Sequence, residues 1–106
     1  MALIRPIPNV SAGSYLIKIT ESSSVVDSAS AISNGDSFNI NNTISVIINN
    51  MSGSFTFTAG TASTLKAVKT DLSVVTLNAG TYNLDEYLML QGVAGTGYTS
   101  TVSFSF

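Results

Sequence analysis

The sequence predicts a small all-β domain, an antiparallel β-sandwich of the jelly-roll or immunoglobulin-like kind with about seven to nine short strands. Two observations predict this class. Short segments of alternating apolar and polar residues recur at spacings of about 8–12 residues, separated by clusters of Gly, Asn, Asp and Ser. No segment repeats apolar residues at helical spacing, and 106 residues suit a single domain with one core.

The strand candidates differ in how clear their pattern is. Residues 15–20, 44–48, 54–58 and 98–106 are the clearest, 24–31 is weaker, and 38–40, 65–69 and 73–77 are short. We expect 44–48 and 54–58 to pair as a hairpin across a turn at 49–53. Asn34-Gly35-Asp36 and Thr70-Asp71 predict further reversals, because these residues favour tight turns.

Two segments near the C-terminus are less certain from pattern alone. Residues 85–90 fit either a strand or one helical turn, and the turns on both sides favour a strand. The glycine-rich segment 92–97 is expected to be a flexible loop, because it lacks the Lys and the strand-to-helix setting of a phosphate-binding loop.

The last strand is predicted to contribute to the core. Its strict alternation places Val102, Phe104 and Phe106 inward, with Thr101, Ser103 and Ser105 outward. Phe55 and Phe57 form a second alternating pair of core candidates.

Residues 77–82, Leu-Asn-Ala-Gly-Thr-Tyr, resemble the corner that precedes a late strand in immunoglobulin-like sandwiches. The resemblance implies that the Tyr82 hydroxyl bonds back across the turn. It covers six residues and lacks the paired cysteines and the core tryptophan of antibody domains. An ordinary turn before a strand with a half-buried tyrosine is the alternative.

The N-terminus differs from the rest of the chain. Residues 1–9 contain both prolines, Pro6 and Pro8, which predict an extended arm ahead of a single domain at 10–106. Leu3, Ile4 and Ile7 give this arm apolar side chains that need cover. We expect it to dock on a neighbouring subunit, and an edge strand of its own sandwich is the alternative.

The surface chemistry is nearly neutral. Only 9% of residues are charged, against about 25% in an average soluble protein, whereas 17 Ser, 12 Thr and 9 Asn supply most of the polarity. Four basic side chains are too few to follow a phosphate backbone, so nucleic-acid binding is not expected. No apolar stretch is long enough to span a membrane as a helix.

Catalysis and metal binding are not expected either. The chain has no His and no Cys, which removes catalytic triads and the usual zinc ligands. The six carboxylates fall mostly in predicted turns rather than facing each other across a cleft. Calcium is the one metal considered, since oxygen-bearing side chains cluster at Asn34, Asp36, Asn39, Asn41 and Asn42, but their spacing does not match a known calcium loop and turns use the same residues. No cofactor is implied.

These observations favour a non-catalytic structural protein that works by assembly, as a homo-oligomer or within a larger shell. The specific expectation is a small virion component, such as a phage capsid decoration (cement) protein, assembled in the host cytoplasm, because a neutral surface accompanies a start without a secretory signal. The alternative is a monomeric recognition module, carbohydrate-binding or adhesin-like, at the cell surface. Tyr15, Tyr82, Tyr87 and Tyr98 would favour it if they shared one face.

Overall fold

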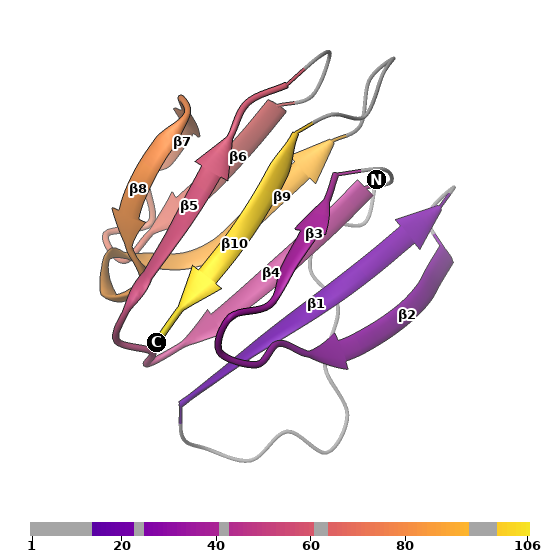
Figure 1. The fold of residues 1–106 in the computed structure, drawn as a ribbon, viewed down its shortest axis with the longest axis horizontal. Helices are drawn as coiled ribbons and strands as arrows, with labels where there is room; N and C mark the ends of the chain where they lie inside the picture. Colours follow the sequence, from indigo (N-terminus) through magenta and orange to yellow (C-terminus); the bar gives the residue numbers. More distant parts are fainter. Residues whose placement is uncertain (1–13, 23–24, 41–42, 61–63, 94–99) are drawn as a thin grey trace.

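The computed structural model describes residues 14–22, 25–40, 43–60, 64–93 and 100–106 (Figure 1). This part of the chain forms ten strands and one short 3₁₀ turn. In chain order these are β1 (Tyr15–Ser22), β2 (Val25–Ala31), β3 (Ser37–Asn39), β4 (Thr43–Asn49), β5 (Ser54–Thr58), β6 (Thr64–Lys69), β7 (Val74–Leu77), β8 (Gly80–Asn83), η1 (Leu84–Glu86), β9 (Tyr87–Val93) and β10 (Thr101–Ser105).

The strands form two sheets that face each other. The larger sheet has six strands in the order β2-β1-β4-β9-β6-β7, and the smaller has four in the order β3-β10-β5-β8. Every neighbouring pair is antiparallel. The chain alternates between the sheets from β2 to β5 and again from β8 to β10, as in jelly rolls, and the β6–β7 hairpin widens the larger sheet. The predicted β-sandwich is therefore confirmed.

The expected hairpin between 44–48 and 54–58 is wrong. β4 pairs with β1 and β9 in the larger sheet, whereas β5 pairs with β10 and β8 in the smaller one. The turn between them carries the chain from one sheet to the other, and Met51 is buried within it. Asn50 has a φ of 58° and Gly53 a φ of 129°, values that let the backbone change direction there.

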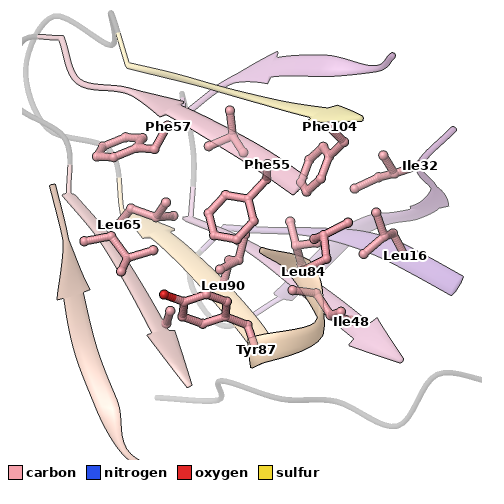
Figure 2. Packing of buried hydrophobic residues seen from close by; sticks show 14 of the residues in the cluster. Leu16, Ile32, Ile48, Phe55, Phe57, Leu65, Leu84, Tyr87, Leu90 and Phe104 are labelled. Carbon is pink, nitrogen blue, oxygen red and sulfur yellow. The ribbon is translucent and has the colours of Figure 1, made fainter. Parts of the chain in front are cut away.

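The core lies between the sheets, with Phe55 near its centre (Figure 2). The Phe55 ring centroid lies 5.4 Å from that of Tyr82, 5.5 Å from that of Tyr87 and 6.3 Å from that of Phe104. Aromatic pairs at these separations add stability beyond the area that they bury. The predicted core positions Phe55, Phe57, Val102 and Phe104 are all buried.

Phe106 is a correction, because it is 38% exposed rather than inward. It follows the end of β10, where the last pair is Ser105 with Ser54, so the ladder no longer directs its side chain into the core. Its backbone N–H instead donates to Asn34 Oδ1 at 2.8 Å.

The region of 85–93 also differs from the expectation in part. Residues 85–90 contain both of the structures considered, since η1 ends at Glu86 and β9 begins at Tyr87. Gly92, expected in a flexible loop, is a buried residue of β9. A Cβ there would lie 3.0 Å from the Ile40 side chain, so glycine allows Ile40 to pack on the strand. Residues 94–97 of the expected loop lie outside the described residues.

The Tyr82 corner is confirmed. The Tyr82 hydroxyl donates a 2.6 Å hydrogen bond to the backbone carbonyl of Asn78, four residues earlier. Gly80, between them, has a φ of 157° and begins β8, so the chain turns from the larger sheet into the smaller one.

Candidate functional site

The polar groups with chemical potential are dispersed and take part in local structure. Asp36 Oδ2 accepts from the Ser33 backbone N–H at 2.8 Å, and Glu86 Oε2 accepts from Asn83 Nδ2 at 3.1 Å. Asp71 Oδ1 accepts from the Ser73 hydroxyl at 2.6 Å and from its backbone N–H at 3.0 Å. The pKa of Asp71 is lowered from its ordinary value by these bonds, the hydroxyl first. Across the described ranges, no three acidic side chains come together as a metal site.

The oxygen-rich segment considered for calcium serves as a structural turn. Asn34 Oδ1 accepts from the Phe106 N–H, and Asp36 closes the turn onto Ser33. Asn39 is exposed in β3. Asn41 and Asn42 lie outside the described residues.

The tyrosines do not form a shared platform in the described part of the chain. Tyr82 and Tyr87 pack edge to face against each other, with ring centroids 6.2 Å apart, on the core side. Burial raises the pKa of the Tyr87 hydroxyl above its ordinary value, and the charge of Glu86 acts in the same direction. Tyr15 is at the start of β1, and Tyr98 lies outside the described residues.

One open groove lies at the end of the sandwich where β4 turns into β5. It has a volume of about 470 Å³, and Asn49, Asn50, Thr70, Asp85 and Tyr87 contribute to its lining. Amide, hydroxyl and carboxylate groups thus surround an opening that has Tyr87 and Leu88 on its apolar side. Such a lining suits a neutral, hydrogen-bonding ligand better than an anion.

The strongest surface feature is the edge of the larger sheet formed by β2 (Figure 1). All seven side chains of β2 are exposed, including Val25 at 61%. β2 pairs only with β1, so its other side presents free backbone N–H and C=O groups. It contains no Lys, Arg or Pro, and Asp27 is its only charged residue, next to a bulge in the pairing with β1. This is an edge with little protection against pairing with another chain.

The other edges are shorter. β7 has four residues, with Val74 66% exposed and Leu72 nearby 74% exposed. β3 has three residues and β8 has four. Short edge strands resist addition of further strands because they offer few hydrogen bonds. Among the described strands, β2 is therefore the best candidate for an intermolecular contact.

Sequence reasoning identified 24–31 only as a weak strand and missed its position at an edge. The absence of Lys and Pro from this segment was the available signal. The expected assembly arm, with Leu3, Ile4, Pro6, Ile7 and Pro8, lies outside the described residues.

No helix in the described ranges is long and apolar enough to cross a membrane. No protein-family model, no curated protein and no solved structure matches this chain.

Proposed function

We propose that this protein is a non-catalytic structural protein that assembles with further copies of itself by adding strands to the β2 edge. The exposed, uncharged and singly paired β2 is the observation that carries the proposal. Strand addition at such an edge gains main-chain hydrogen bonds, and apolar side chains such as Val25 and Val26 lose water in the contact.

The composition supports the same function. Ten charged residues among 106 give little electrostatic repulsion between copies, and the formal net charge is only −2. A surface of hydroxyl and amide groups is compatible with close neighbours on several sides. The setting that we propose is a virion, where the protein would be a small component such as a phage capsid decoration protein.

A monomeric recognition module is the second candidate, and the groove beside the β4–β5 turn favours it. Asn49, Asn50 and Asp85 offer amide and carboxylate groups next to the Tyr87 ring, which are groups that bind neutral sugars. A chain that stays monomeric and binds a glycan, with binding lost in Asp85→Ala, would support this function instead.

Assembly state tests the main proposal. Size-exclusion chromatography with light scattering should give a mass that is a multiple of 11.0 kDa and rises with concentration. Ser28→Lys places a charge in the middle of β2 and should return the protein to a monomer with an unchanged melting temperature. Ser103→Lys, on an exposed position of the central strand β10, is the matched control and should assemble normally.

Two results contradict the proposal. One is a wild-type mass of 11.0 kDa at every concentration. The other is normal assembly of Ser28→Lys, which would move the contact away from β2.

A further inference from the structure

We propose that residues 1–13 of this chain pack across the outer face of its own six-stranded sheet, the face that points away from the four-stranded sheet. This inference is independent of the proposed assembly through β2, because it concerns a face of the sheet and not its edge.

The outer face carries an apolar row that crosses all six strands. The strand register aligns one residue from each strand, and directly paired residues point to the same face. The row consists of Ala31, Ile17, Ile47, Met89, Val68 and Val74. Five strand spacings of about 4.8 Å make it about 24 Å long. A sheet face that is left in water normally alternates to polar residues, so this row indicates a covered face.

The direction of these side chains follows from β1. Leu16 belongs to the core, and Lys18 Nζ lies 4.9 Å from the centre of the Phe38 ring in the opposite sheet. Both therefore face inward. Because side chains alternate along a strand, Ile17, Ile19 and Glu21 face outward.

Burial on this outer face is deeper than the described neighbours explain. Ile19 is only 2% exposed, yet its cross-strand neighbours on the same face are the small residues Ala29 and Ser45. Ser45 itself is 0% exposed and Met89 is 6% exposed. Short neighbours cannot shield an isoleucine from water, so a further segment of the same chain must lie over this patch.

The N-terminal segment has the length and the starting point to supply this cover. Thirteen extended residues span about 43–47 Å, well beyond the length of the row. The segment joins the sheet at Ser14, whose hydroxyl donates to the Asn50 carbonyl at 2.7 Å. Tyr15 is two residues from Ile17, so the segment begins within about 7 Å of the row.

The other undescribed segments are poorer candidates for this cover. They contain two, two, three and six residues, and each connects two strands. The longest, 94–99, has to carry the chain from β9 to β10 in the opposite sheet. By contrast, Leu3, Ile4, Ile7 and Val10 give residues 1–13 apolar side chains that match the row.

Charge complements the apolar contact. Glu21 is on the same outer face and is only 4% exposed. A carboxylate at this depth is stabilised by a cation or by hydrogen-bond donors. Arg5 is the only basic side chain in residues 1–13, so the segment would bring a guanidinium to the face that holds Glu21.

Thiol labelling tests the inference cleanly because the chain has no cysteine. Ser45→Cys is nearly isosteric and reports on the outer face, whereas Ser103→Cys reports on an exposed position of the other sheet. With a small maleimide, Ser45→Cys should react at least about tenfold more slowly than Ser103→Cys, at any protein concentration. Introducing Ile4→Asp and Ile7→Asp should raise the Ser45→Cys rate and leave the Ser103→Cys rate unchanged.

Two controls keep the result interpretable. Ala67→Cys, in the core at 1% exposure, should stay protected in the chain with both aspartates, which shows that the domain remains folded. Should that chain unfold, Ile4→Cys in an otherwise unchanged chain provides the second measurement, and it should be protected. Unchanged protection of Ser45→Cys beside the two aspartates, or rapid labelling of Ile4→Cys, overturns the inference. Protection that disappears on dilution overturns it as well, because the covering segment would then come from another copy.

Discussion

The Tyr82 hydroxyl donates a 2.6 Å hydrogen bond to the Asn78 carbonyl, while the ring of the same tyrosine stacks on Phe55 at 5.4 Å. One side chain thus ties the turn between β7 and β8 to the centre of the core. The turn is where the chain passes from the larger sheet to the smaller one, so the two contacts together set the position of β8.

Tyr82→Phe keeps the ring contact and removes the hydrogen bond. We expect a loss of about 1 kcal/mol in the free energy of unfolding, measured by urea denaturation. Tyr82→Leu also removes the aromatic contact and should cost more. Equal stability of the wild type and Tyr82→Phe would mean that water replaces the hydroxyl bond at no cost.

Local pattern was sufficient to predict those parts of the fold that depend on neighbours in sequence. Strict alternation placed Val102 and Phe104 in the core, and the spacing of Asn78, Gly80 and Tyr82 predicted the corner. Both depend on chain geometry within a few residues, which the sequence states directly.

Long-range choices could not be predicted in this way. The segments 44–48 and 54–58 alternate equally well as a hairpin or as strands of opposite sheets, because either arrangement buries one face of each. Gly92 has the composition of a loop, and only the packing of Ile40 on β9 explains its place in a strand. The exposed edge at β2 depends on the order of all six strands, which no short segment contains.

The terminal strand provides a test of burial. Phe104→Ala should lower the free energy of unfolding by about 3–5 kcal/mol, because it leaves a cavity in the aromatic core. Ser103→Ala, on the exposed side of the same strand, should cost less than about 0.5 kcal/mol. Phe106→Ala should cost far less than Phe104→Ala, since Phe106 is already partly in water. A similar loss for the two phenylalanines in urea denaturation would show that Phe106 is buried in solution.

The two turn glycines should respond differently to alanine. Gly53 has a φ of 129°, and a Cβ there would lie 2.5 Å from the Ser105 carbonyl oxygen. Gly53→Ala should therefore cost about 3 kcal/mol or more. Gly35 has a φ of 88° but no atom within 4 Å of the new Cβ, so Gly35→Ala should cost only about 1 kcal/mol of backbone strain. Thermal unfolding of both variants measures the difference, and equal losses would indicate that the chain end near Gly53 moves aside.

The final prediction concerns Arg5 and Glu21, and it follows from the packing of residues 1–13 on the outer face. If the guanidinium lies against the buried carboxylate, Arg5→Gln and Glu21→Gln should each lower the free energy of unfolding. The double variant should lose less than the sum of the two, with a coupling of about 1–3 kcal/mol. Lys66→Gln is the matched control, because Lys66 is exposed on the same sheet in β6, and its loss should add to that of Glu21→Gln. Full additivity between Arg5→Gln and Glu21→Gln would show that the arm does not bring its charge to this face, since two groups in contact do not contribute independently.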